Sequence, residues 1–180
     1  VCIIRNVNAD AVIAVYPFTP QPIITQALMM AADIPVFAGV GGGLTSGNRV
    51  VNLALFAEMQ GAAGVVVNAP TSNDIISKLN AQIDIPVIVT VVNESVDFKE
   101  RVKSGATIFN VSAAKNTASI VRDIRREFPE FPIIATGGPT DESILETIEA
   151  GANAITWTPP TIGDVFKGIM EAYRENKPHP

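Results

Sequence analysis

The stretch Phe131–Thr161, "FPIIATGGPTDESILETIEAGANAITWTPPT", contains two short apolar runs with a helical pattern between them. The first run ends in Thr-Gly-Gly, and the second ends in Thr-Trp-Thr-Pro-Pro. Between them Ile144, Leu145 and Ile148 form one apolar stripe, and acidic residues occupy the other face, as in an amphipathic helix. A strand, a helix and a second strand in this order indicate a parallel βαβ unit.

The same unit recurs along the rest of the chain. Eight Val/Ile-rich runs are apolar at nearly every position, a pattern typical of strands that are buried on both faces of a parallel sheet. These runs are Cys2–Asn6, Ala11–Tyr16, Pro35–Val40, Gly64–Asn68, Pro86–Val92, Thr107–Ser112, Pro132–Thr136 and Ala154–Thr158. The helical patterns that follow the second to the eighth run are Pro22–Ala32, Asn48–Gln60, Ser72–Gln82, Val96–Ser104, Thr117–Phe128, Asp141–Ala150 and Ile162–Glu175.

Eight strands joined by helices predict one compact domain over residues 1–180, an α/β fold of the (βα)8 TIM-barrel type. Only Val7–Asp10 separates the first two runs, which is too short for a helical crossover, so we expect this barrel to lack a helix there. An open, doubly wound sheet is the alternative, because fewer than eight strands would suit it.

The composition narrows the class of partner. Thirteen Lys and Arg stand against eighteen Asp and Glu, and the net charge of −5 is the opposite of the basic footprint of nucleic-acid binders. A single cysteine rules out a disulfide within the chain, and no apolar run is long enough to span a membrane. We therefore expect a cytoplasmic protein with neither nucleic acid nor membrane as partner. A mean hydropathy of +0.28 in a charge-poor chain favours a homo-oligomer.

Polar residues recur where the expected strands end. Ligands bind at the carboxyl ends of parallel strands in both candidate folds. Alternation along the strands points a set of neutral hydrogen-bonding side chains inward at this end. The predicted pocket-lining residues are Asn68, Thr90, Asn110, Ser112 and Thr156, with Thr136 beside them. A hydrated barrel end without a ligand is the alternative interpretation.

Two glycine clusters lie at the same end. Backbone N–H groups free of side chains, followed by a helix N-terminus, make a natural phosphate site. We therefore predict that Thr136, Gly137, Gly138 and Thr158 bind phosphate, at the loops after the seventh and eighth strands. The loop Gly39–Asn48 has two open interpretations, a ligand loop or lid and a plain surface loop; no Lys-Ser or Lys-Thr follows at the spacing of a P-loop.

Acid–base groups are few near the predicted mouth. The only histidine, His179, lies in a Pro-rich tail, and no Cys/His cluster is present, so no metal site is predicted and no cofactor is expected. Glu94 and Lys115 are the candidate catalytic residues.

The opening stretch resembles the repeating unit of the phosphate-binding TIM-barrel superfamily. Residues 105–116 and 128–138, "GATIFNVSAAKN" and "FPEFPIIATGG", are also similar to two-keto-3-deoxy-6-phosphogluconate aldolases. The resemblance implies a Schiff-base lysine on the sixth strand, but Asn110 or its neighbour takes that place and Lys115 lies beyond the strand end. An amide cannot form a Schiff base, which speaks against that mechanism.

A looser similarity spans nearly the whole chain and relates it to the glycerol-uptake operon antiterminator family, through "IIRN", "FPIIATGG" and "AGANAIT". That resemblance implies a ligand of the glycerol 3-phosphate kind, while the acidic charge argues against carrying over RNA binding. The main prediction is therefore a barrel, with a regulatory role as one form, that binds a phosphorylated small molecule. The alternative is a lyase or isomerase on a phosphorylated substrate, and a third is flavin phosphate at the same site. Catalysis is left open.

Overall fold

The computed structural model describes residues 4, 8–16 and 18–178. Within these residues, seven parallel strands form one sheet in the order in which they occur along the chain. The strands are β1 (Val12–Ala14), β2 (Val36–Gly41), β3 (Gly64–Val67), β4 (Val87–Val91), β5 (Ile108–Val111), β6 (Ile133–Thr136) and β7 (Ala154–Thr156). The helices are α2 (Pro22–Ala31), α3 (Asn48–Met59), α4 (Asn73–Asn80), α5 (Phe98–Lys103), α6 (Thr117–Glu127), α7 (Asp141–Glu149) and α8 (Ile162–Arg174), with a 3-10 turn η1 (Ala114–Asn116) before α6.

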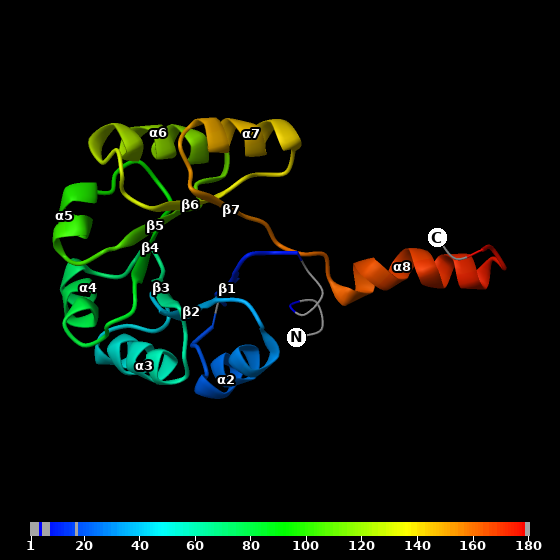
Figure 1. Cartoon of the computed structure of the whole chain (residues 1–180), viewed down its shortest axis with the longest axis horizontal. Helices are drawn as coiled ribbons and strands as arrows, with labels where there is room; N and C mark the ends of the chain where they lie inside the picture. The colour runs from blue at the N-terminus through cyan, green and yellow to red at the C-terminus, as the bar shows by residue number, and fades with distance from the viewer. Residues whose placement is uncertain (1–3, 5–7, 17, 179–180) are drawn as a thin grey trace.

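The sheet curves, and helices α2 to α7 lie along its outer face (Figure 1). Each strand therefore has one side towards the helices and one towards the concave inner face. On β4, Val89 and Val91 belong to the core between sheet and helices, whereas Thr90 points the other way and is half-buried. This alternation explains why runs that are apolar throughout still carry a polar residue near their carboxyl ends.

The core is densest around β4 to β6. Phe109 of β5 is fully buried, and its ring centroid lies 5.7 Å from that of Phe98 and 4.7 Å from that of Phe131. Burying one such ring contributes about 1.5–3 kcal/mol. The half of the sheet that ends in β6 is thus held firmly against α5 and α6.

The prediction of a closed eight-stranded barrel is wrong. Within the described residues the sheet has seven strands, and β1 and β7 do not pair with each other. Closure of a parallel barrel normally takes eight tilted strands, so seven leave an open half-barrel. The first expected strand, Cys2–Asn6, and the missing helix after it lie outside the described residues except for Ile4. The doubly wound alternative is also wrong, because the strands follow one another in sequence order.

The last helix, α8, does not join the outer layer. It projects away from the body of the molecule after an extended link that follows β7 (Figure 1). The helical pattern Ile162–Glu175 predicts the helix itself, but the pattern does not indicate where the helix lies. Among the described residues no helix combines the length and apolarity needed to cross a membrane.

Candidate functional site

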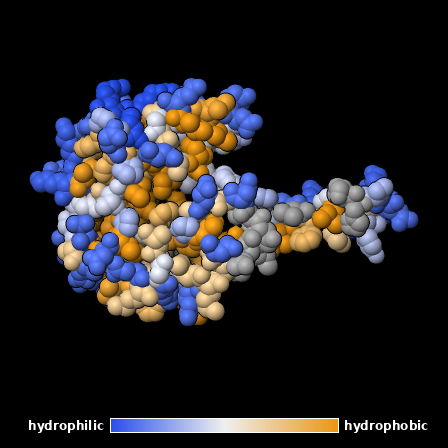
Figure 2. Space-filling view, in the orientation of Figure 1, coloured by the Kyte–Doolittle hydropathy of each residue, from blue (hydrophilic) through white to orange (hydrophobic). Residues whose placement is uncertain are grey.

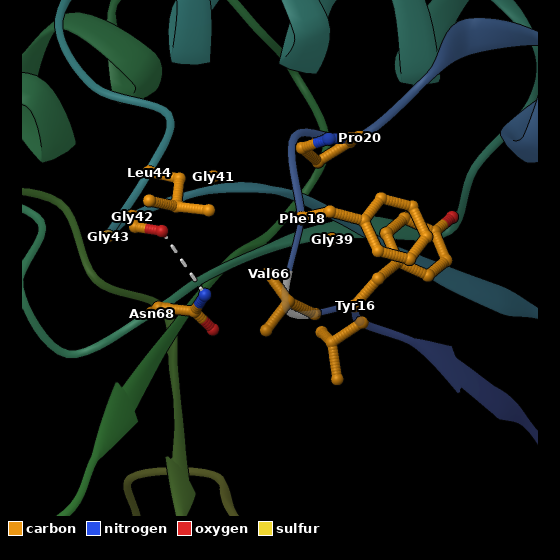
Figure 3. Close-up of a pocket in the computed structure, with 11 residues that line it drawn as sticks. Tyr16, Phe18, Pro20, Gly39, Gly41, Gly42, Gly43, Leu44, Val66 and Asn68 are labelled. Carbon is orange, nitrogen blue, oxygen red and sulfur yellow. Dashed lines mark hydrogen bonds between the residues drawn. The ribbon is translucent and has the colours of Figure 1, made fainter.

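A cavity of about 250 Å³ opens at the carboxyl ends of β1, β2 and β3 (Figure 3). Its lining combines an aromatic pair, a run of glycines and one amide side chain. The lining residues are Val15, Tyr16, Phe18, Pro20, Gly39, Gly41, Gly42, Gly43, Leu44, Val66 and Asn68. Tyr16 is the one ionisable side chain among them, so the lining carries no formal charge at neutral pH.

Glycine is required where the loop after β2 crosses the neighbouring strand end. A Cβ atom on Gly42 would lie 2.7 Å from the Thr71 hydroxyl oxygen and 2.8 Å from Cβ of Asn68, and its φ of +98° is one that other residues rarely adopt. A Cβ atom on Gly41 would lie 2.7 Å from Cγ2 of Val50. The side chains are therefore absent for reasons of close packing, and the result is a cavity wall made of bare backbone.

The same loop presents backbone donors. Gly42 donates its N–H to the Thr45 carbonyl at 2.8 Å and so closes a tight turn. Within the described residues, the N–H groups of Gly43 and Leu44, at the tip of that turn, donate to no other group. Successive N–H groups in a turn with positive φ form a concave site that favours anions.

The backbone of Asn68 is fixed by a hydrogen bond, and its side chain lines the cavity. Its N–H donates to the Gly41 carbonyl at 2.9 Å, and its amide Nδ2 donates to the Gly42 carbonyl at 3.4 Å (Figure 3). One amide N–H and the amide oxygen stay available to a ligand. Beside it the Thr71 hydroxyl is buried and has no hydrogen-bond partner among the described residues.

Tyr16 contributes the only acidic proton of the cavity. Its ring stacks on Phe18 with centroids 5.3 Å apart and planes 11° from parallel. Its hydroxyl is buried without a well-aligned hydrogen-bond partner among the described groups. Burial raises the pKa of Tyr16, and the nearby Thr25 hydroxyl opposes this only in part. The phenol is therefore protonated at neutral pH, and its hydroxyl lies near the Thr25 hydroxyl of α2.

The polar side chains predicted from strand alternation lie on the inner face. The Asn110 amide donates to the Thr90 hydroxyl at 3.3 Å, and the hydroxyls of Thr136 and Thr156 are 3.4 Å apart. Ser112, just past β5, is exposed. Of the predicted pocket-lining residues only Asn68 lines the cavity at β1–β3, and a ligand-binding role for the others stays a prediction.

The glycines after β6 have structural reasons of their own. A Cβ atom on Gly137 would lie 2.7 Å from Cγ1 of Ile144 and 2.8 Å from Cγ2 of Ile155, so α7 packs on β6 and β7 only if this residue is glycine. Gly138 has a φ of +85°, and a Cβ atom there would meet the Ser143 hydroxyl at 2.6 Å. The turn is therefore tight whether or not a ligand binds there.

The N-terminus of α7 is already capped by its own side chains. Thr140 and Ser143 form a reciprocal capping box. The Glu142 carboxylate accepts hydrogen bonds from its own backbone N–H and from Thr140, which lower its pKa. These contacts occupy donors that a phosphate would use. Thr158 is exposed in the link to α8. Phosphate binding by Thr136, Gly137, Gly138 and Thr158 stays a prediction.

The two candidate catalytic residues lie outside the cavity. Glu94 is exposed in the bend after β4, and Lys115 is exposed in η1. A catalytic role for them stays a prediction. Across the described part of the chain no group of three or more His, Cys, Asp and Glu side chains is placed to hold a metal ion. His179 lies outside the described residues.

No protein-family model matches the chain, and no curated protein matches it. Solved structures do match the chain. Dihydrodipicolinate synthase from Bacillus anthracis superposes with a TM-score of 0.70 at 16% identity, over 97% of this chain and 67% of that one. 2,3-dimethylmalate lyase, a member of the PEP mutase/isocitrate lyase superfamily, gives 0.65 at 14%, over 86% and 64%. Phosphonopyruvate hydrolase in complex with oxalate and Mg²⁺ gives 0.64 at 14%, over 87% and 66%.

At these identities the likeness shows the fold alone, a TIM-barrel-like arrangement of alternating parallel strands and helices. The chain spans about two thirds of the length of these neighbours. No match supports the finer resemblance to the glycerol-uptake operon antiterminator family.

Sequence reasoning did not single out Tyr16 or Thr71. Tyr16 lies at the carboxyl end of the first described strand, which was a usable signal, but whether its hydroxyl is buried and unpaired depends on packing. The loop Gly39–Asn48 had two equal interpretations, and the structure places its first half in the cavity wall.

Proposed function

We propose that the chain carries an aldolase-type lyase or isomerase site at the carboxyl ends of β1–β3, for a small carbonyl compound with a negative charge. One observation carries this proposal: Tyr16, whose buried hydroxyl has no well-aligned hydrogen-bond partner among the described residues, lines a cavity together with bare glycine backbone, apolar side chains and the Asn68 amide. A buried donor without a partner is costly unless a ligand satisfies it.

The preference for an anion follows from the donors around the cavity. The N–H groups of Gly43 and Leu44 and the Asn68 amide supply hydrogen bonds to a carboxylate or phosphate. Arg49 lines a second cavity of about 340 Å³ that shares Pro20 with the first, and its cation adds a favourable field.

The chemistry that this arrangement suits is stabilisation of an enolate. When the C3–C4 bond of a 4-hydroxy-2-oxo acid breaks, its electron pair moves onto the 2-oxo oxygen, C4 leaves as an aldehyde, and the 4-hydroxyl proton passes to water. The enolate then takes a proton from water at C3 and leaves as the 2-oxo acid. A tyrosine hydroxyl aimed at the 2-oxo oxygen stabilises the new charge, and it does so best in a site with little water. The pKa of Tyr16 is raised, so the group remains a donor at neutral pH.

A Schiff-base route is not part of the proposal. None of the seven described strands contains a lysine, and Asn110 occupies the inward position on β5. The solved structures similar to this chain include a synthase, a lyase and a hydrolase, which supports lyase-type chemistry more than a purely regulatory site.

The test is an assay of pyruvate release from a panel of 4-hydroxy-2-oxo acids, with and without a terminal phosphate, coupled to lactate dehydrogenase. We expect turnover of at least one compound, and a fall of about 100-fold in kcat/KM for Tyr16→Phe because the enolate loses its donor. Tyr173→Phe, an exposed tyrosine on α8, is the matched control and should leave kcat/KM unchanged.

Two outcomes would overturn the proposal. One is that no compound is cleaved and oxalate, an enolate mimic, does not raise the melting temperature. The other is that borohydride with a 2-oxo acid traps a covalent adduct, which would restore a Schiff-base mechanism. A thermal shift with glycerol 3-phosphate that Tyr16→Phe leaves unchanged would favour the phosphate-binding function at β6–β7 instead.

A further inference from the structure

The second cavity, of about 340 Å³, opens between α3 and the segment that leads into α2. Its size falls in the range of small-molecule sites, roughly 300–1,000 Å³. The α3 residues of its lining recur at intervals of three and four, so they share one face of the helix. The lining residues are Thr19, Pro20, Gln21, Pro22, Arg49, Asn52, Leu53 and Phe56. Of these, Pro20 alone also lines the cavity at β1–β3.

Arg49 is the one charged residue in this lining, and no carboxylate balances it. Among the described residues its guanidinium makes no ion pair and no hydrogen bond. Helix α2 has no charged residue, and the acidic residue of α3, Glu58, lies at the far end of that helix. The Glu58 carboxylate is already engaged, because it accepts the N–H groups of Asp84 and Ile85. A cation in a cavity without a counter-charge favours an anion there.

Neutral hydrogen-bond donors line the same cavity as Arg49. Gln21 donates one amide N–H to the Thr19 carbonyl at 3.4 Å, so its second amide N–H is available. The Thr19 hydroxyl accepts a hydrogen bond from the Thr45 hydroxyl at 2.9 Å, and its own proton has no acceptor among the described residues. The Asn52 amide is exposed. A guanidinium with amide and hydroxyl donors suits the oxygen atoms of a carboxylate or a phosphate.

The rest of the cavity wall is apolar. Pro20 is buried, Leu53 is half-buried, and Phe56 is 46% exposed. In the space-filling view apolar residues cover much of α2 and α3, with hydrophilic residues between them (Figure 2). A wall of this kind suits an organic anion better than an inorganic one, because the carbon part of the ligand covers Leu53 and Phe56 while its oxygen atoms meet Arg49.

We propose that this cavity is a separate binding site for a small organic anion, with Arg49 as its anchor. The ligand is a carboxylate or a phosphate joined to an apolar body of a few carbon atoms. The site stands without the proposed lyase function, since none of its donors belongs to the cavity at β1–β3.

The two cavities are linked by one buried residue. Thr45 is 2% exposed, its hydroxyl donates to Thr19 in the second cavity, and its carbonyl accepts the Gly42 N–H in the wall of the first. A ligand that fixes Thr19 therefore also fixes the hydrogen-bond partner of Thr45 and stabilises the turn at Gly42. We expect positive coupling between the two ligands, and this part of the inference rests on the proposed function.

The first test is isothermal titration of the full chain with hexanoate, hexyl phosphate and hexanamide. Hexanamide has the carbon chain of hexanoate but no charge. We expect the better of the two anions to bind about tenfold more tightly than hexanamide, and Arg49→Gln to remove this advantage. Arg174→Gln, which changes an exposed arginine on α8, is the matched control and should keep the advantage. Equal binding of all three compounds, or an advantage that survives in Arg49→Gln, would overturn the proposal.

Acetate tests the apolar part of the site. It carries the charge of hexanoate without the carbon chain, so we expect it to bind about tenfold more weakly, because it removes less apolar surface from water. Equal binding of acetate and hexanoate would show that the site recognises charge alone, which contradicts an organic ligand.

The second test measures the coupling and separates this inference from the lyase function. We expect oxalate to bind about fivefold more tightly when hexanoate saturates the chain, and Thr45→Val, which removes the linking hydroxyl, to abolish the effect. Oxalate affinity that hexanoate leaves unchanged would contradict the coupling. Displacement of hexanoate by oxalate would show that the two cavities are one site and would overturn the proposal. Hexanoate that binds through Arg49 to a chain that does not bind oxalate would support the anion site and contradict the lyase function.

Discussion

Tyr16 is the residue on which the functional proposal depends. Among the described residues its hydroxyl is buried without a well-aligned hydrogen-bond partner, so it contributes little to the stability of the folded chain without ligand. We therefore expect Tyr16→Phe to leave the free energy of unfolding unchanged or to raise it slightly, since removing an unpaired buried polar group is neutral to stabilising. Urea unfolding followed by circular dichroism measures this. A loss of more than about 2 kcal/mol would mean that the hydroxyl has a structural partner and would weaken its assignment to a ligand.

At Gly137, in contrast to Tyr16, we expect a substitution to lower the stability of the fold. A methyl group there would press on Ile144 and Ile155, so Gly137→Ala should destabilise the fold by about 1–3 kcal/mol through overpacking. Gly168→Ala is the control, because no atom lies within 4 Å of the position that its methyl group would take, and alanine favours a helix. Equal stability of the two variants would show that packing does not require a glycine at position 137. That result would favour the phosphate site predicted at Gly137 and Gly138.

At the scale of the element, α7 shows how a helix start responds to pH. The pKa of Glu142 is lowered by hydrogen bonds from its own N–H and from Thr140, so its contribution to stability is present above its ordinary value of 4.5 and is lost as pH falls through the lower folded value. Glu142→Gln should therefore make the fall in melting temperature on the acid side shallower. Glu149→Gln, at the other end of α7, should not reproduce this effect.

The strands and helices show how much of the fold can be predicted from the sequence. Apolar runs and three-to-four spacing predict β2 to β7 and α2 to α8 closely, because those signals are local. Closure of the sheet is not local: it depends on whether β1 meets β7, and no pattern within either strand decides that. The place of α8 depends on a surface outside the helix. Likewise, strand alternation predicts that Asn110 lies on the inner face of the sheet. The burial of the Tyr16 hydroxyl depends on packing and cannot be predicted from a local pattern.

At the scale of the molecule, the described part of the chain is an open, seven-stranded half-barrel with its amphipathic last helix extended. The cavity at β1–β3 lies beside the edge of β1 that pairs with no strand among the described residues.

The most direct measurement for the central claim is a crystal structure of the protein soaked with oxalate. We predict density for oxalate in the cavity at β1–β3, with one carboxylate on the Asn68 amide and the other on the side of the cavity that Tyr16 lines. Density at Gly137 and Gly138 alone, or an empty cavity at an oxalate concentration that saturates the thermal shift, would contradict the account.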